Sequence, residues 1–384
     1  MSHTDNADVA VIGGGVIGLA VAWRLAQRGA SVTLFERGAL GDGASSVAAG
    51  MLAPVSEAEY GVSGRHALEL GLAVARRWPG FAHELGQAAG RPVSLRRSGT
   101  LMLARDRDEA EALEREHRFR DSLGLVTRRL RSSQARALEP ALAPNLRLAL
   151  EIPDDHSVDP REVLAALRQA AATAGVRVRE GTAVSGLWLA RAEDRVQGVE
   201  LGDGERVVAD QVVVASGAWT GALEGIPEAL RVPVRPLKGQ TLRLRDPAGP
   251  GLLGRVVRYP GGYLVPRDDG RYVLGATMEE RGHDVTPTAG GMYDLLRDAH
   301  EHVPGVSELV IEEIAVGLRP GTADNLPAIG RAALAGLVWA VGHHRSGILL
   351  TPLTADLVTA AVAGEAPDDL ARACAPARFE RVPA

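Results

Sequence analysis

The sequence is poor in side chains that form cross-links or bind soft metals. Among its 384 residues, Cys374 is the only cysteine and Lys238 is the only lysine. A single cysteine excludes an intrachain disulfide bond and any metal site built from several thiolates. We interpret Cys374 as an incidental thiol, and we attribute the use of arginine for nearly all of the 43 basic residues to genomic base composition.

A strong charge imbalance and long apolar runs are also missing. The formal net charge of −5 argues against a nucleic-acid partner and against a polybasic membrane contact. Residues Met1–Asp8 are polar and lack the positive start and apolar run of a secretory signal. The most apolar early stretch, Val9–Trp23, contains four glycines and is shorter than the roughly 20 apolar residues that span a membrane. We therefore predict a cytoplasmic protein without a membrane-spanning segment.

Glycine, by contrast, is abundant, with 45 residues, and three glycines form a G-x-G-x-x-G motif. Gly13, Gly15 and Gly18 lie between a predicted strand, Val9–Ile12, and a predicted helix, Leu19–Arg28. In this motif the first glycine makes a tight turn, the second lets the backbone approach a pyrophosphate, and the third lets the helix pack on the strand. The phosphates then lie at the helix N-terminus.

The context of the motif strengthens this interpretation. A second predicted strand, Ser31–Phe35, ends at Glu36, which stands 18 residues after Gly18 and is placed to accept a hydrogen bond from a ribose hydroxyl. Strand, glycine turn, helix and strand make a βαβ unit. The motif predicts dinucleotide binding but does not distinguish FAD from NAD.

The rest of the chain alternates between helical and strand patterns, without internal repeats or low-complexity linkers. The length suits two or three domains, and we expect them to be interwoven in sequence. The patterns predict helices over 66–89, 105–123, 160–174 and 348–363, and strands over 207–214, 263–266, 271–274, 311–318 and 337–341. The charged helix 105–123 is typical of a solvated outer face.

Other catalytic arrangements are not evident. The pairs His300/His302 and His343/His344 lack an acidic partner at metal-ligand spacing, so we predict no metal site. No Ser-His-Asp set or pair of carboxylates stands out either.

Arg319 is the strongest candidate for binding a carboxylate. It follows the strand-like run Ile311–Leu318 and precedes Pro320, so its side chain is predicted to lie at a strand end beside a turn. Its planar fork matches a carboxylate through two parallel hydrogen bonds. The ordinary alternative is a surface or salt-bridging arginine.

Four segments resemble the D-amino-acid oxidase superfamily of flavoproteins. They are residues 36–52, with the run Ala48-Ala49-Gly50-Met51-Leu52, residues 212–220, residues 317–330, which open with Gly-Leu-Arg-Pro-Gly-Thr, and residues 342–350, with the run Gly-His-His-Arg-Ser-Gly. Within the superfamily the sequence is most similar to the bacterial glycine oxidases of thiamin biosynthesis. The resemblance extends from about residue 8 to 363.

The resemblance implies an α/β fold with a doubly wound, Rossmann-like FAD domain and a smaller α+β substrate domain with a mixed or antiparallel sheet. It assigns 1–85, 145–222 and 320–384 to the FAD domain, and 86–144 and 223–319 to the substrate domain. It also implies non-covalent FAD, since Cys374 is far from the position where related sarcosine oxidases attach flavin.

The resemblance further assigns individual residues. Near the substrate it places Arg319, Tyr263, Arg345, Met278 and Met51. Tyr263 would meet the same carboxylate as Arg319, and the two methionines would form apolar walls; a tyrosine or methionine that only packs in the core is the alternative. The FAD contacts are expected at Gly13, Gly15, Val16, Ile17, Gly18, Glu36, Arg37, Ala44, Ser45, Ala49, Gly50, Met51, Val184, His343, His344, Arg345, Ser346, Gly347, Ile348 and Leu349.

The reaction implied is oxidative deamination of glycine or another small amine or D-amino acid, in which the α-hydrogen leaves as hydride to the flavin, the imine hydrolyses to a 2-oxo acid, and oxygen becomes hydrogen peroxide. The alternatives are an oxidase or dehydrogenase of sarcosine, proline-like or other D-amino acids, and a flavin-binding protein without turnover. Two departures from related enzymes leave the substrate range open. Met278 stands about where sarcosine oxidases carry an oxygen-activating lysine, and Gly261 stands where glycine oxidases carry a histidine. The oligomeric state is left open.

Overall fold

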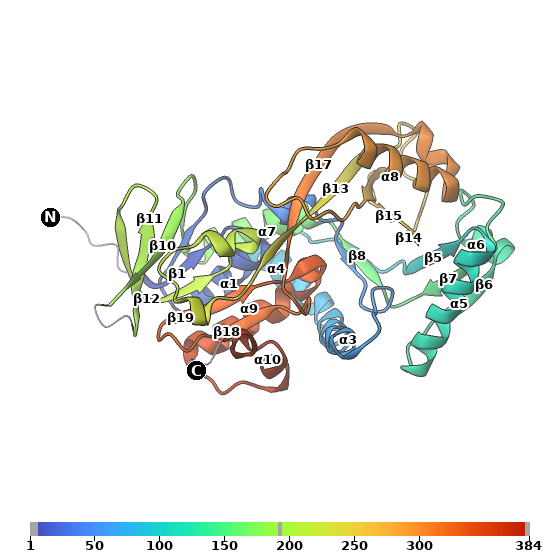
Figure 1. Ribbon diagram of the computed structural model, residues 1–384. Helices are drawn as coiled ribbons and strands as arrows, with labels where there is room; N and C mark the ends of the chain where they lie inside the picture. The colour runs from blue at the N-terminus through green and yellow to red at the C-terminus, as the bar shows by residue number, and fades with distance from the viewer. Residues whose placement is uncertain (1–6, 191–193, 381–384) are drawn as a thin grey trace.

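The computed structural model describes residues 7–190 and 194–380. Residues 1–6, most of the segment in which we predict no secretory signal, lie outside the described part. Two large sheets organise the chain, one on the left and one on the upper right of Figure 1.

The first sheet contains the predicted βαβ unit at its centre. Strand β1 (Ala7–Ile12) pairs in parallel with β2 (Val32–Phe35), and α1 (Val16–Gln27) connects them. Parallel pairing continues in the order β9-β2-β1-β12-β19, which is a doubly wound arrangement. The remaining strands of this sheet are β9 (Arg177–Arg179), β10 (Val184–Leu189), β11 (Val196–Leu201), β12 (Arg206–Val214), β18 (Ala328–Arg331) and β19 (Leu337–Val341).

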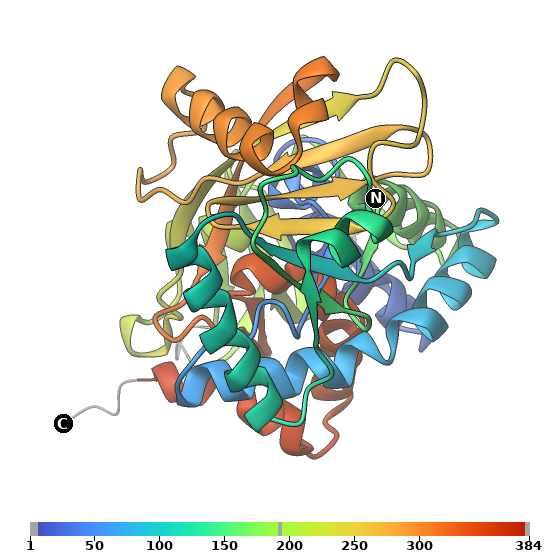
Figure 2. The same ribbon diagram turned by 90° about the vertical axis from the view of Figure 1, so that its right-hand side faces the viewer.

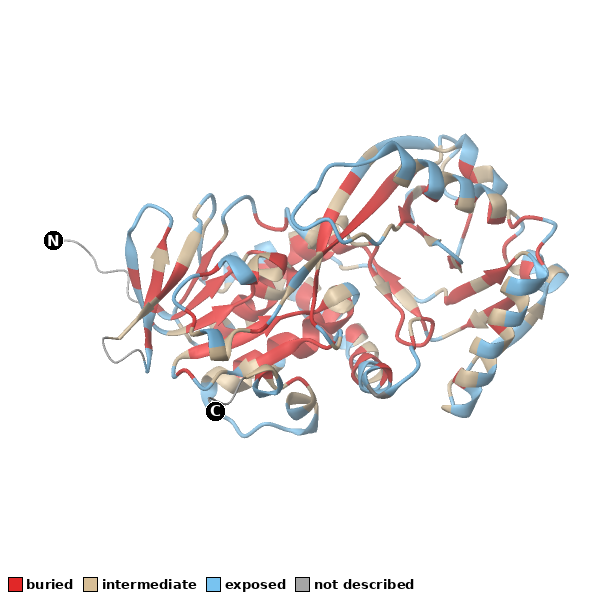
Figure 3. Cartoon of the chain, viewed as in Figure 1, coloured by how far each residue is buried: buried red, intermediate tan, exposed pale blue. Residues whose placement is uncertain are grey.

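Both faces of this sheet are covered. Val9 and Val11 of β1 belong to the apolar cluster under the helices, while Ala10 and Ile12 belong to the cluster on the opposite face. This explains the continuous apolar run of the strand, because a central parallel strand is buried on both sides. The covering helices are α1, α3 (Val62–Ala75), α4 (Trp78–Ala89), α7 (Pro160–Thr173) and α9 (Gly347–Ala363). Figure 3 shows this region as the most continuously buried part of the molecule.

Helix α9 corrects one expectation. The helical stretch His344–Ala363 is long and apolar enough to cross a membrane, so the prediction that no such segment occurs was wrong. The helix nevertheless packs against α1, α3, β18 and β19, and 61% of its most apolar window is buried inside the protein. Its apolar composition is thus explained by its place in the core.

The second sheet is mostly antiparallel and has the order β17-β13-β16-β15-β14-β5-β7-β6. Figure 2 shows α8 (Ala289–His302) above this sheet and α5 (Arg107–Ser122) in front of it. Strands β13 and β17 are the longest pair of this sheet, and they extend from the centre of the molecule toward the upper right of Figure 1. The strands are β5 (Thr100–Ala104), β6 (Arg128–Arg131), β7 (Leu148–Ile152), β13 (Arg235–Arg245), β14 (Val256–Tyr259), β15 (Gly262–Pro266), β16 (Arg271–Gly275) and β17 (Val310–Gly321).

Short elements complete the fold. A small sheet consists of β3 (Met51–Leu52), β8 (His156–Val158) and β4 (Leu95–Arg96). The remaining helices are α2 (Ala44–Val47), α6 (Ser132–Leu138) and α10 (Asp369–Ala373), with 3₁₀ turns η1 (Gly217–Ala222), η2 (Glu228–Leu230), η3 (Pro304–Glu308), η4 (His344–Ser346) and η5 (Pro376–Phe379).

The sequence patterns were right about most elements and wrong about two details. The predicted helix 66–89 is two helices, because Pro79 in the first turn of α4 has no N–H for a continuous helix and its ring would clash with the preceding turn. Arg319 does not end its strand, since β17 continues to Gly321. The division into domains stays a prediction; β7 pairs within the second sheet although it follows the boundary at 145, and β17 crosses the boundary at 320.

Candidate active site

A cavity of about 390 Å³ lies between the first and the second sheet. All five residues predicted near the substrate line it, namely Arg319, Tyr263, Arg345, Met278 and Met51. So do many of the predicted FAD contacts, namely Val16, Ile17, Ala44, Ser45, Ala49, Gly50, His343, His344, Gly347 and Ile348. The structure therefore brings together residues more than 300 positions apart in the sequence.

Other predicted FAD contacts lie outside this cavity. Leu349 is 6% exposed, and its carbonyl accepts a hydrogen bond from Trp78 Nε1. Val184 begins β10 and packs against the apolar cluster that contains Ala10 and Ile12, on the face of the first sheet opposite the helices. Ser346 ends η4. The other predicted contacts outside the cavity are Gly13, Gly15, Gly18, Glu36 and Arg37.

The three motif glycines have different reasons to be glycine. Gly13 has φ +108°, and a Cβ there would lie 2.5 Å from the carbonyl oxygen of Ala215. A Cβ on Gly18 would overlap the carbonyl oxygen of Gly13, so this glycine lets α1 pack closely on β1. Gly15 has φ −73°, which any residue adopts, and a Cβ there would meet only Ser45 Oγ, at 3.2 Å. The protein atoms thus explain Gly13 and Gly18, whereas Gly15 borders open space.

This space suits the pyrophosphate of FAD. It lies at the N-terminus of α1, whose first turn contains no acidic residue and whose Val16 N–H points to Ser45 Oγ at 3.0 Å. At the end of β2, Glu36 accepts from the N–H groups of Gly14 and Gly38, at 2.7 and 2.9 Å, which fixes its carboxylate beside the turn. A positive helix end, a glycine without a steric reason and a fixed carboxylate match the two ends of a dinucleotide site.

Arg37, predicted to contact FAD, has an aromatic partner in the structure. Its guanidinium lies 3.6 Å from the centre of the Trp219 ring, and Trp219 stacks on His283 with ring centres 4.2 Å apart. This stack links the end of β2 to the segment 276–288, which connects β16 to α8. The predicted contact of Arg37 with the cofactor stays a prediction.

His343 and His344 follow the predicted strand β19, and His344 begins the 3₁₀ turn η4. Burial lowers the pKa of His343 to about 3, and its Nε2 lies 2.9 Å from Thr354 Oγ1. Burial, aided by nearby arginines, lowers the pKa of His344 to about 4. Both imidazoles are therefore neutral near pH 7. His344 Nε2 is buried and has no hydrogen-bond partner in the described part of the chain, so it can still bond a bound group.

Arg319 differs from the other arginines of the cavity in its surroundings. Within the described residues no carboxylate lies at ion-pair distance from it, and its Nη1 donates to the carbonyl oxygen of Thr277, at 3.1 Å. Burial raises the pKa of Tyr263, although Arg319 opposes the shift, so its phenol stays protonated and can donate. A cation and a hydroxyl donor thus face one cavity, which suits a carboxylate.

Two glycines make room for this pair. A Cβ on Gly239 would overlap the Arg319 guanidinium, and a Cβ on Gly275 would lie 2.7 Å from the Tyr263 hydroxyl oxygen. Both glycines are in regular strands, where glycine is unfavourable without a packing reason. Sequence reasoning missed both of them.

Replacing Gly239 by alanine tests this arrangement. The new methyl group overlaps only the far end of the Arg319 side chain, so the guanidinium should move while β13 keeps its pairing. We expect kcat/KM for carboxylated amines to fall by about 10-fold or more, with FAD content and melting temperature close to wild type. A normal kcat/KM in Gly239→Ala would contradict the placement of the Arg319 guanidinium over β13. Gly290→Ala is the matched control, because a Cβ at Gly290 has open space around it.

Glu57 is the only acidic residue among the described residues that line the cavity, and sequence reasoning missed it. Its Oε1 lies 3.2 Å from Arg258 Nη1, and its Oε2 lies 3.4 Å from Arg345 Nε. Arg258 is also new; it pairs across β14 and β15 with Tyr263 and donates to Ser56 Oγ at 3.0 Å. The Glu57 carboxylate therefore forms ion pairs with two of the three arginines that line the cavity.

Two buried side chains, Asp155 and Arg120, anchor the loop that carries Glu57. Asp155 accepts the N–H groups of Val55 and Ser56, at 3.0 and 2.7 Å, and burial raises the pKa of Asp155 to about 6. Arg120 of α5 donates to the carbonyl oxygens of the same two residues, at 2.8 and 2.9 Å. These bonds hold the backbone of the loop, and hence Glu57, in place.

The opposite face of β13 holds the segment 276–288. The Lys238 ammonium bonds Asp284 Oδ2 at 2.7 Å and the carbonyl oxygen of Thr286 at 2.6 Å, and it holds the pKa of Asp284 well below its usual value. Gln240 bonds Glu279 and Thr288 on the same side. The alternate residues of β13, Gly239 and Thr241, line the cavity. The segment that supplies Thr277 and Met278 to the site is thus fixed through the strand beneath it.

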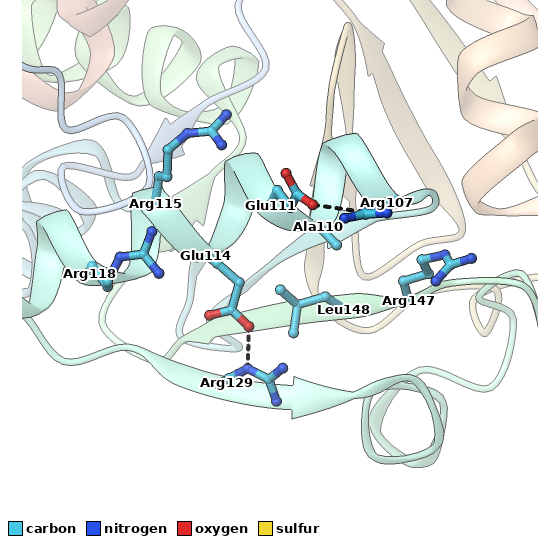
Figure 4. Close-up of a pocket in the computed structure, with 9 residues that line it drawn as sticks. All are labelled: Arg107, Ala110, Glu111, Glu114, Arg115, Arg118, Arg129, Arg147 and Leu148. Carbon is cyan, nitrogen blue, oxygen red and sulfur yellow. Dashed lines mark hydrogen bonds and ion pairs between the residues drawn. The ribbon is translucent and has the colours of Figure 1, made fainter.

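A second hollow, of about 490 Å³, lies between α5 and β6 (Figure 4). None of the predicted site residues lines it. Its charged side chains lie on the solvent side, with Glu111 bonded to Arg107 and Glu114 to Arg129, so α5 has the solvated face that its sequence predicts. Within the described residues no cluster of three or more potential metal ligands occurs.

Comparison with known proteins agrees with this geometry. The model of the DAO family, described as FAD dependent oxidoreductase, matches residues 8–361. The glycine oxidase of Geobacillus kaustophilus is 37% identical over 357 residues, which are 92% of each chain. The bifunctional protein ThiO/ThiG of Synechocystis sp. is 35% identical over 97% of this chain and 54% of its own length.

Solved structures give the same result. The crystal structure of the Geobacillus kaustophilus glycine oxidase has a TM-score of 0.88 at 36% identity, covering 97% of this chain and 99% of the other. That of the iminodiacetate oxidase from Chelativorans sp. has a TM-score of 0.83 at 30% identity, covering 94% and 96%. Fold, cavity and relatives agree, and the chain belongs to the family of FAD-dependent oxidoreductases.

Proposed function

We propose that this protein is an FAD-dependent oxidase that deaminates glycine or another small amino acid to the 2-oxo acid, with ammonia and hydrogen peroxide as the other products. The proposal rests on the environment of Arg319. This cation is part-buried, lines the cavity together with Tyr263 and has no acidic partner among the described residues. The glycine oxidase relatives support the substrate class.

FAD, the cofactor of this family, would be held by the turn Gly13–Gly18, the N-terminus of α1, Glu36 and the residues that line the cavity between the sheets. When bound, it supplies the two-electron oxidation of the amine and delivers the electrons to oxygen. The contribution of the protein is to bind, orient and desolvate the substrate.

Each site residue has a proposed task. Arg319 binds the carboxylate through its fork, and the Tyr263 hydroxyl donates a further hydrogen bond to it. Met51 and Met278 give apolar walls that exclude water from the reacting carbon. Glu57, the carboxylate among the described lining residues, is paired, and the lowered pKa values of His343 and His344 make both imidazoles weak bases. The substrate amine therefore enters in its neutral form, and no side-chain base is needed.

The first test of this function is the purified protein itself. We expect it to be yellow and to release FAD on denaturation, because its only cysteine, Cys374, is buried and cannot tether the ring. Glycine should bleach the bound flavin in the absence of oxygen and yield peroxide in its presence. A flavin that does not bleach with any small amine would favour a flavin-binding protein without turnover.

Substrate profiling decides among the alternatives. Oxidases or dehydrogenases of sarcosine, proline-like and other D-amino acids would share the carboxylate site and differ in preferred amine and electron acceptor. We further propose a cytoplasmic enzyme whose product serves thiamin thiazole synthesis. The resemblance to glycine oxidases of that pathway supports this role, as does the likeness to ThiO/ThiG. Comparing oxygen with dye acceptors over a panel of amines gives the ranking directly.

A further inference from the structure

We propose that Glu57 is a specificity-determining residue that limits the site to amines with a single carboxylate, an inference that rests on the proposed function. It does so by occupying the two arginines that a second acidic group would need. The charged residues of the cavity lining are Arg319, Arg258, Arg345 and Glu57.

The pairing of these charges leaves one arginine free. The two oxygens of Glu57 face different arginines, Oε1 toward Arg258 and Oε2 toward Arg345. Arg345 has a second acidic partner, Glu59, as well. Arg319 alone has no acidic neighbour among the described residues, so one substrate carboxylate completes the ion pairing of the cavity.

A second carboxylate would meet an unfavourable environment. It would have to displace Glu57 from Arg258 or Arg345, or lie beside it, and like charges that are poorly hydrated repel strongly. The side chain of Glu57 is only 18% exposed, so solvent screens this repulsion less than at an open surface. Asp155 and Arg120 fix the backbone just before Glu57, and Arg258 and Arg345 hold its carboxylate.

Removing the charge of Glu57 should reverse the preference. In Glu57→Gln, Arg258 and Arg345 lose their shared anion and become available to a second substrate carboxylate. The test compares two pairs of amines that differ by one carboxylate, iminodiacetate with sarcosine and D-aspartate with D-alanine. Within each pair, we expect the ratio of kcat/KM, acidic over neutral, to rise about 10-fold or more in Glu57→Gln.

Two further variants make the result specific. Glu59→Gln also removes a carboxylate that pairs with Arg345 and lies on the same loop, but Glu59 does not line the cavity. The ratio of kcat/KM, acidic over neutral, should therefore stay within about 3-fold of wild type. The double variant Glu57→Gln/Arg258→Gln should lose most of the gain, because Arg258 is absent and Arg345 remains paired with Glu59. Arg258→Gln alone should lower the ratio of kcat/KM, acidic over neutral. This change is opposite to the one expected in Glu57→Gln, so it keeps the test decisive if Glu57→Gln is poorly folded.

Binding separates this inference from the proposed function. Titration calorimetry of the FAD-loaded protein with malonate and acetate requires no turnover, and Glu57→Gln should gain affinity for malonate relative to acetate. If the wild type oxidises no amine but the malonate preference appears, the proposed reaction fails and the role of Glu57 stands. An unchanged ratio in Glu57→Gln, or an equal rise in Glu59→Gln, would overturn the role of Glu57.

Discussion

Arg319→Ala should reduce kcat/KM for glycine and other carboxylated amines by roughly 30- to 1000-fold, which corresponds to about 2 to 4 kcal/mol for a lost bidentate, charge-assisted pair. Among the described residues Arg319 has no acidic partner to be left unpaired, so the fold and the FAD content should be near normal. Steady-state peroxide formation, measured together with flavin content, tests both statements.

The controls for Arg319 separate charge from shape. Arg319→Lys should recover only part of the activity, because an ammonium lacks the planar fork. An amine without a carboxylate should be oxidised poorly and equally by wild type and variant. If Arg319→Ala loses FAD, or slows both kinds of amine alike, then Arg319 is a structural residue and the amino-acid assignment loses its main support.

Gly15→Val should lose FAD while keeping the fold. The backbone at Gly15 suits any residue, and only Ser45 Oγ lies near the new Cβ, so the far-UV circular dichroism spectrum should be unchanged. The branched side chain would occupy the space proposed for the pyrophosphate. We expect a nearly colourless protein, measured as flavin absorbance per chain after purification.

Gly18→Ala is the matched comparison, three residues away in the same motif. Its Cβ would overlap the backbone carbonyl of Gly13, which cannot move without disturbing β1. This variant should therefore lower the melting temperature by about 5 °C or more, or fail to fold. Normal FAD content in Gly15→Val would show that the turn does not touch the cofactor.

Local patterns in the sequence predicted much of the fold. The βαβ unit could be predicted because glycines, apolar runs and Glu36 stand at spacings fixed by backbone geometry. The hairpin of β15 and β16 could be predicted because Asp268-Asp269-Gly270 is a strong turn signal. The break between α3 and α4 was missed although Pro79 signals it, because the apolar pattern continues through the break.

The site was harder to predict, since its parts meet only in three dimensions. Arg258 had a usable signal, because the turn around Pro260 and Gly261 places it opposite Tyr263. Glu57 had none, since its position depends on Asp155 and Arg120, which are remote in sequence. Gly239 looks like any strand glycine until Arg319 is placed over it.

The single lysine gives this protein an unusual surface. Lys238 is 1% exposed, and its ammonium is bonded on the far side of β13, so amine-directed dyes, biotin esters and aldehyde supports find no accessible lysine on the folded chain. A label on Lys238 requires the segment 276–288 to leave β13, so the extent of labelling at Lys238, read by mass, reports how often that segment opens.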